Sequence, residues 1–113
     1  MKEFFEKIKA YGFERKAVME RFINDEEFYV ECFSQVLNDI AFDDLGKFLE
    51  MDDKKEAFDC AHSLKGIVSN IGLTVLYDKI YQIVEILRGT EQGDVFTYYN
   101  ELQELRKECL DLL

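Results

Sequence analysis

Apolar and polar residues recur with a helical period along most of the chain. Between residues 25 and 51, apolar side chains stand three or four positions apart, as on one face of an α-helix. Asn24, with Glu27 three residues later, is typical of a helix N-terminus. This pattern predicts one long helix or a kinked pair over 25–51. The expected inward positions are Tyr29, Phe33, Val36, Leu37, Ile40, Ala41, Leu45, Phe48 and Leu49.

The remaining chain predicts three more amphipathic helices, over 53–71, 74–88 and 95–113. Asp53, with Glu56 three residues later, marks the start of the first of these. Glycines separate the segments and suit the turns between them. The expected inward positions are Ala57, Ala61, Leu64, Val68 and Ile71 in the first, Leu76, Ile80, Ile83 and Leu87 in the second, and Tyr99, Leu102, Leu105 and Cys109 in the third.

These segments predict an all-α protein, because no stretch alternates with the period of two that a strand requires. No proline, low-complexity run or repeat divides the chain, so we expect a single domain over 1–113. Four such helices pack most simply as an antiparallel up-down four-helix bundle. Residues 1–22 would form short helical segments that cap one end of it. Their apolar residues are Phe4, Phe5, Ile8, Phe13 and Phe22.

Composition narrows the classes of partner. Of the 113 residues, 48% are hydrophobic, which suffices for a core without metals or disulfides. The 24 acidic and 14 basic residues give a net charge of −10, which repels nucleic acid and anionic membranes, so we expect neither as a partner. The three cysteines are scattered and predict neither a disulfide framework nor a zinc site. With no apolar run typical of a signal peptide or a membrane span, we expect a soluble, cytoplasmic protein.

The only histidine, His62, falls on the outer face of the helix predicted over 53–71. At 100° per residue, it lies about 140° from the centre of the apolar stripe, so its imidazole should be exposed. A lone exposed histidine commonly has no specific role. Here, however, Phe58, Lys65, Gly66 and Ser69 share its face, because residues three, four and seven apart lie on one side of a helix.

Gly66 is unusual in the middle of a helix, where glycine costs about 1 kcal/mol relative to alanine. Close packing of a neighbouring helix would explain it, but the helical phase places Gly66 away from the core. A bare backbone beside an exposed imidazole suggests instead that a bulky partner approaches there.

The same side of the helix is locally basic. Residues 54–65 contain three lysines and two acids, a balance of +1 in a chain of charge −10. Lys54 and Lys55 are equally well explained as ordinary solvated lysines, whereas Lys65 lies one turn from His62. Phe58 and Ile67 would frame this basic spot with apolar surface. Partly exposed core packing is the alternative for both.

The residues around His62 disfavour most kinds of catalysis. Ser63 and Cys60 project away from it on a helix, so no hydrolase-type nucleophile is paired with the imidazole. Asp59 is the only evident metal co-ligand, and Lys65 would repel a cation. No glycine-rich phosphate loop is present. What remains is the imidazole itself as a nucleophile toward phosphorus, since an exposed histidine is largely neutral at pH 7.

The run A-H-S-L-K-G at 61–66, followed by Asn70, Gly72, Leu73 and Leu76, resembles the signature of histidine-containing phosphotransfer (HPt) domains. The resemblance extends to G-F-E-R-K-A-V-M-E-R-F at 12–22 and to N-D-E-E-F-Y at 24–29. It implies a four-helix bundle in which His62 accepts a phosphoryl group from the aspartyl phosphate of a response-regulator receiver domain and passes it on reversibly.

The resemblance also implies roles for the neighbours of His62. Lys65 matches the lysine near the phosphate, and Gly66 matches the glycine at which the partner comes close. Asn70 and Gly72 match positions that shape the helix end. Ile67 and Val68 depart from the family, in which small residues are frequent at these positions. We expect a partner to contact the following residues: Phe58, Lys55, Ile67, Ser69 and Asn70.

The expected partners are a receiver domain, a hybrid sensor histidine kinase or both, with no small-molecule substrate. The resemblance implies that the protein itself needs no cofactor or metal, because in this family the Mg²⁺ is bound by the receiver. We expect no kinase, ATPase or hydrolase activity of its own. The alternative is an interaction module that binds a receiver or a helical partner through the same face, with His62 never phosphorylated.

Overall fold

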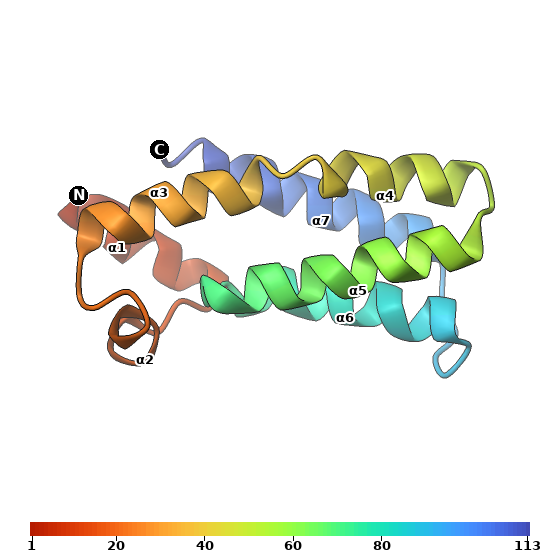
Figure 1. Ribbon diagram of the computed structural model, residues 1–113, viewed down its shortest axis with the longest axis horizontal. Coiled ribbons are helices and arrows are strands. Elements are labelled where there is room, and N and C mark those ends of the chain that lie inside the picture. Colours follow the sequence, from red (N-terminus) through yellow and green to blue (C-terminus); the bar gives the residue numbers. More distant parts are fainter.

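The computed structural model describes residues 1–113 and contains helices and no strands (Figure 1). The prediction of an all-α protein is therefore confirmed. The elements in chain order are α1 (Lys2–Ile8), the short 3-10 helix η1 (Lys9–Tyr11), α2 (Arg15–Glu20), α3 (Glu26–Leu37), α4 (Ala41–Glu50), α5 (Lys54–Asn70), α6 (Thr74–Arg88) and α7 (Val95–Leu110).

The longer helices run along the long axis of a molecule that measures 41 × 23 × 20 Å. In Figure 1, α3 and α4 follow each other along one side, and α1 and α2 lie at the end where α3 begins. Helix α5 packs between α4 and α6, and α6 packs in turn against α7. This arrangement leaves one face of α5 without a neighbouring helix.

The segment predicted over 25–51 is two helices, α3 and α4, with a break at residues 38–40. Side chains take over the backbone hydrogen bonds there: Asn38 Nδ2 donates to the Ser34 carbonyl at 2.9 Å, and Asp39 Oδ1 accepts from the Ala41 amide at 2.8 Å. Because the break interrupts the helical phase, Ile40 is 69% exposed rather than inward. That predicted core position was wrong.

Three helices, α3, α5 and α7, begin at an aspartate whose side chain accepts a hydrogen bond from a backbone amide of the first turn. Asp53 caps α5 as predicted, since its carboxylate accepts from the Glu56 amide at 3.2 Å. Helix α3 is capped by Asp25, which accepts from the Phe28 amide, and not by Asn24 as predicted. Asn24 instead has a left-handed backbone with φ of 56° and belongs to the turn before the helix.

One continuous core of apolar side chains holds the helices together. The five residues expected to cap one end, Phe4, Phe5, Ile8, Phe13 and Phe22, are all buried. Three of them, with Phe33, pack around Tyr29: its ring centroid lies 5.0–6.1 Å from those of Phe5, Phe13, Phe22 and Phe33. The buried Tyr29 hydroxyl donates to the Ile71 carbonyl at 2.6 Å, which ties the aromatic cluster to the end of α5.

Candidate functional site

Helix α5 presents His62 to solvent because its opposite face is fixed in the core. Ala57, Ala61, Leu64 and Val68 are fully buried, as the helical phase predicted. His62 is exposed and makes no hydrogen bond or ion pair. Its ring nitrogens are therefore open to an incoming group.

The imidazole of His62 stacks on the ring of Phe58, one turn earlier in α5. The two ring centroids are 5.9 Å apart and the planes are inclined by 21°. Phe58 is half-buried, and the guanidinium of Arg88 in α6 lies over its ring, 5.3 Å from the ring centroid. Arg88 Nε in turn lies 3.8 Å from Glu85 Oε2. The contacts therefore continue from His62 to the end of α6.

Lys65 lies on the other side of His62 and also reaches α6. Its Nζ is 5.7 Å from the ring centroid of Tyr81, which is 41% exposed. No carboxylate lies within ion-pair distance of the ammonium. The positive charge of Lys65 is therefore not neutralised within the chain.

Gly66 lies on open surface. A Cβ atom built on it would meet no atom within 4 Å, whereas one on Gly46 would lie 2.5 Å from the Tyr99 hydroxyl. Gly46 is thus required by packing between α4 and α7. Packing does not account for Gly66, so the alternative explanation for this mid-helix glycine is removed.

The other two lysines of the predicted basic face are placed differently from Lys65. Lys55 is exposed and its Nζ lies 3.5 Å from Asp59 Oδ2 in α5. Lys54, assigned by helical phase to the same side as His62, instead lines a pocket at the far end of the molecule. Of the three lysines, Lys65 lies one turn from His62, whereas Lys55 lies two turns from His62 on the same face of α5.

The C-terminal part of α5 carries the rest of the predicted contact surface. Ile67 is half-buried, while Ser69 and Asn70 are exposed. The backbone carbonyls of Ser69 and Asn70 accept hydrogen bonds from Arg21 Nη1, at 3.0 and 3.2 Å. The segment after α2 therefore secures the end of the helix that carries His62.

Cys60 lies on the opposite side of α5 from the imidazole, as expected. Its Sγ is 3.2 Å from the Ala41 carbonyl of α4. Burial raises the pKa of this thiol to about 11, so little thiolate forms at neutral pH. Cys60 is therefore not arranged as a nucleophile paired with His62.

Helical phase on α5 alone did not reveal Tyr81, Arg88 and Arg21, because these residues come from other elements. One signal was present: Phe58 and Lys65 are seven residues apart on α5, and their partners Arg88 and Tyr81 are seven apart on α6. Residues at this spacing share a helix face. Two antiparallel helices therefore bring the four residues together in opposite order.

The site is a surface and not a cavity. His62, Lys65 and Gly66 line none of the main pockets of the molecule. Small-molecule sites are usually concave and bury most of their ligand, so this face is better suited to contact with a macromolecule. No group of three His, Cys, Asp or Glu side chains is arranged to hold a metal ion. None of the helices combines the length and apolar character needed to cross a membrane.

Comparisons of the chain with protein-family models, with curated proteins and with solved structures found no match.

Proposed function

We propose that the protein is an HPt-type histidine phosphocarrier of a two-component phosphorelay, which accepts a phosphoryl group on His62 from the aspartyl phosphate of a receiver domain. One observation carries the proposal: an exposed imidazole without a hydrogen-bond partner shares its helix face with Lys65 and the bare backbone of Gly66. The resemblance of residues 61–66 to the HPt signature agrees with it.

The transfer is a substitution at phosphorus. The lone pair of a His62 ring nitrogen forms the P–N bond while the bond from phosphorus to the receiver's aspartyl oxygen breaks, and aspartate leaves as a carboxylate. No electron is gained or lost overall. Lys65 would counter charge on the phosphoryl oxygens, and the open space at Gly66 would admit the receiver's active site. In the reverse direction the same atoms exchange in the opposite order.

Helices α3 and α4, which are separated by the break at residues 38–40, have one structural role in this proposal. Helices α3 and α4 together would act as one arm of an up-down four-helix bundle, with α5, α6 and α7 as the other three. The near-collinear course of α3 and α4 in Figure 1 supports this description. Short helices α1 and α2 would then cap the end of the bundle beside Arg21.

Charge supports a receiver as the partner. The Mg²⁺-binding pocket of a receiver is acidic, and the basic side chains Lys65 and Arg88 lie within an otherwise acidic chain of charge −10. A hybrid sensor kinase that contains a receiver domain would present the same chemistry. The carrier contributes no cofactor to the transfer.

The deciding experiment uses receivers of the protein's own organism, phosphorylated with radioactive phosphate. The wild-type protein should take up label that is labile in acid and stable in base, as phosphohistidine is. His62→Gln should take up none while keeping its helical circular dichroism. Absence of label on the wild type with every receiver tested would contradict the proposal.

A second candidate is an interaction module that binds a receiver or a helical partner without phosphorylation. The half-buried Phe58 and Ile67 and the exposed Tyr81 favour it, since they provide apolar contact area around His62. In that case His62→Gln would bind the partner as tightly as the wild type, and neither protein would carry label.

A further inference from the structure

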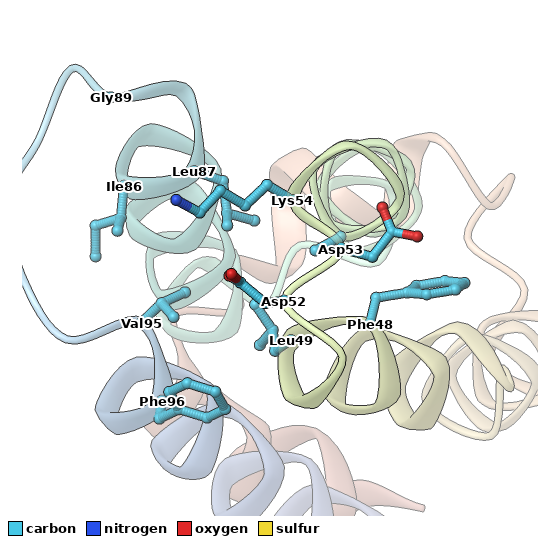
Figure 2. A pocket seen from close by; sticks show the side chains of 11 residues that line it. Phe48, Leu49, Asp52, Asp53, Lys54, Ile86, Leu87, Gly89, Val95 and Phe96 are labelled. Atoms are coloured by element: carbon cyan, nitrogen blue, oxygen red, sulfur yellow. The ribbon is translucent and has the colours of Figure 1, made fainter.

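A pocket of about 290 Å³ opens at the end of the molecule farthest from α1 and α2. It lies where the turn between α4 and α5 meets the end of α6 and the start of α7 (Figure 2). Its apolar wall is made by the following residues: Phe48, Leu49, Ala57, Ile86, Leu87, Val95 and Phe96. None of the residues proposed for phosphotransfer lines this pocket.

Two opposite charges stand at this pocket without neutralising each other. Lys54 extends toward Leu87 of α6, and the Asp52 carboxylate points into the space between Lys54 and Val95 (Figure 2). Neither side chain forms a hydrogen bond or an ion pair, with the other or with any third group. The third charged lining residue, Asp53, is occupied as the N-cap of α5.

The backbone holds Asp52 in this position. Its φ of 53° is in the left-handed region, which residues other than glycine adopt uncommonly and aspartate adopts more readily than most. The Asp52 and Asp53 amides donate to the carbonyls of Leu49 and Phe48, so the turn is fixed. The backbone of this turn therefore places the exposed Asp52 at the rim of the pocket, beside the apolar wall.

We propose that this pocket binds a zwitterionic ligand of the size of an apolar α-amino acid. The ligand's ammonium would meet Asp52, its carboxylate would meet Lys54, and its side chain would contact Leu87, Val95 and Phe96. A ligand with a single charge would be attracted by one of these two side chains and repelled by the other, so it would gain less than a zwitterion. The volume of about 290 Å³ is at the lower limit of small-molecule pockets, which favours a ligand of amino-acid size.

The site is separate from the phosphotransfer face. Lys54 precedes His62 by eight residues on α5, a rise of about 12 Å along the helix axis. A ligand at Lys54 would leave His62 and Lys65 uncovered. The inference therefore stands whether or not His62 is phosphorylated.

The test is a nuclear magnetic resonance titration of the full-length protein with three probes of nearly equal shape. L-Phenylalanine carries both charges, 3-phenylpropionate only the carboxylate, and phenethylamine only the ammonium. Phenylalanine should shift the amide signals of residues 52–57 and 86–96, with a dissociation constant of about 1 mM given about twelve non-hydrogen atoms. The two single-charge probes should bind about fivefold more weakly.

Three single-charge variants identify the contacts. Asp52→Asn keeps a residue that tolerates the left-handed backbone, and Lys54→Met keeps the apolar stem. Each should weaken phenylalanine binding about fivefold. Asp52→Asn should also strengthen the binding of 3-phenylpropionate, and Lys54→Met should strengthen the binding of phenethylamine. Lys55→Met is the matched control, because Lys55 pairs with Asp59 outside the pocket, and should leave binding unchanged.

The proposal is overturned if phenylalanine shifts none of these signals at about 10 mM, ten times the expected dissociation constant. It is equally overturned if either single-charge probe binds as well as phenylalanine, or if Lys55→Met weakens binding as much as Lys54→Met. The amide spectrum of each variant reports its fold in the same experiment. Lys54→Gln replaces Lys54→Met if the latter spectrum is not native.

Discussion

The imidazole of His62 lies against the ring of Phe58, and the Arg88 guanidinium lies over that same phenylalanine. An exposed histidine on a helix would otherwise sample several side-chain rotamers. Contact with a half-buried ring restricts those rotamers, and Arg88 links the arrangement to α6. The orientation of the proposed nucleophile thus depends on a second helix.

Replacing Phe58 with leucine should release the imidazole while keeping apolar volume in its place. Because an aromatic pair contributes about 0.5–1.5 kcal/mol, we expect phosphorylation of His62 to slow about threefold. Phosphoramidate, which transfers its phosphoryl group to histidine and releases ammonia, measures this rate without a receiver. The His62 ring-proton signals should also lose the shift caused by the phenylalanine ring current. Unchanged signals in Phe58→Leu would contradict the stacking, and Tyr81→Leu serves as a control that should not move them.

Gly66→Ala and Gly46→Ala should change stability in opposite directions. Alanine at 66 meets open space and gains helix propensity, so the free energy of unfolding should rise by about 0.5–1 kcal/mol. Alanine at 46 would displace the Tyr99 hydroxyl from the Phe42 carbonyl, which it contacts at 2.7 Å, and should lower stability by about 1 kcal/mol. Urea unfolding measures both.

A bulky residue at position 66 should hinder the docking of a partner without changing the stability of the fold. Gly66→Phe should leave the unfolding midpoint near that of the wild type, because a Cβ atom at this position meets no atom within 4 Å and phenylalanine has a higher helix propensity than glycine. Transfer from a phosphorylated receiver should nevertheless fall at least tenfold, whereas phosphoramidate should still label His62. Equal losses with both donors would show that the substitution disturbs the helix and not the docking of a partner.

Tyr29→Phe should destabilise the protein without altering chemistry at His62. The hydroxyl is buried and donates to the Ile71 carbonyl, so its removal leaves that carbonyl without this partner at a cost of about 1–2 kcal/mol. Thermal and urea unfolding should report the loss, and labelling by phosphoramidate should be unchanged in the folded protein. A variant as stable as the wild type would mean that water replaces the hydroxyl.

Stability should fall in alkaline solution because burial, partial for Cys60 and complete for Cys109, raises the pKa values of two thiols. Burial raises the pKa of Cys109 to about 12 and that of Cys60 to about 11. Since the unfolded chain releases these protons at lower pH than the folded protein, the stabilising difference is complete below about pH 9 and is lost as pH rises toward 12. Cys109→Ala, although less stable at neutral pH, should lose less over this range. Unfolding curves at several pH values provide the comparison.

The sequence pattern predicted correctly which face of α5 is buried, because small and aliphatic residues line one side of that helix and mostly polar residues the other. Ala57, Ala61, Leu64 and Val68 form an unbroken apolar stripe, which determines where His62 points. Asp53 begins α5 and a glycine follows it, so its limits were predictable to within one residue.

The break between α3 and α4 was harder to locate because apolar residues continue through it. Leu37, Ile40 and Ala41 maintain the helical period, yet Asn38 and Asp39 bind the local backbone and interrupt the helix. Arg106 of α7 also donates to the Leu37 carbonyl, at 2.6 Å. That partner is 69 residues away in sequence, and no local pattern identifies it.

The positions of charged side chains were the least predictable part of the candidate site. A helical wheel gives the direction of a Cα–Cβ bond but not the path of a flexible lysine. Lys54 thus extends toward α6 at the far end, although it was grouped with His62. Lys65 and Arg88 are held by aromatic rings whose relation to α5 depends on how α6 packs.

The contact between Lys65 and Tyr81 leaves the Lys65 ammonium free to meet an anion without first breaking an ion pair. Lys65 is half-buried, and a cation over an aromatic ring is held by only about 1 kcal/mol while its charge stays unpaired. A carboxylate partner would have to be displaced before the ammonium could meet an arriving anion. If the protein has the proposed function, Lys65 therefore breaks no ion pair when it moves from the Tyr81 ring to a phosphoryl group.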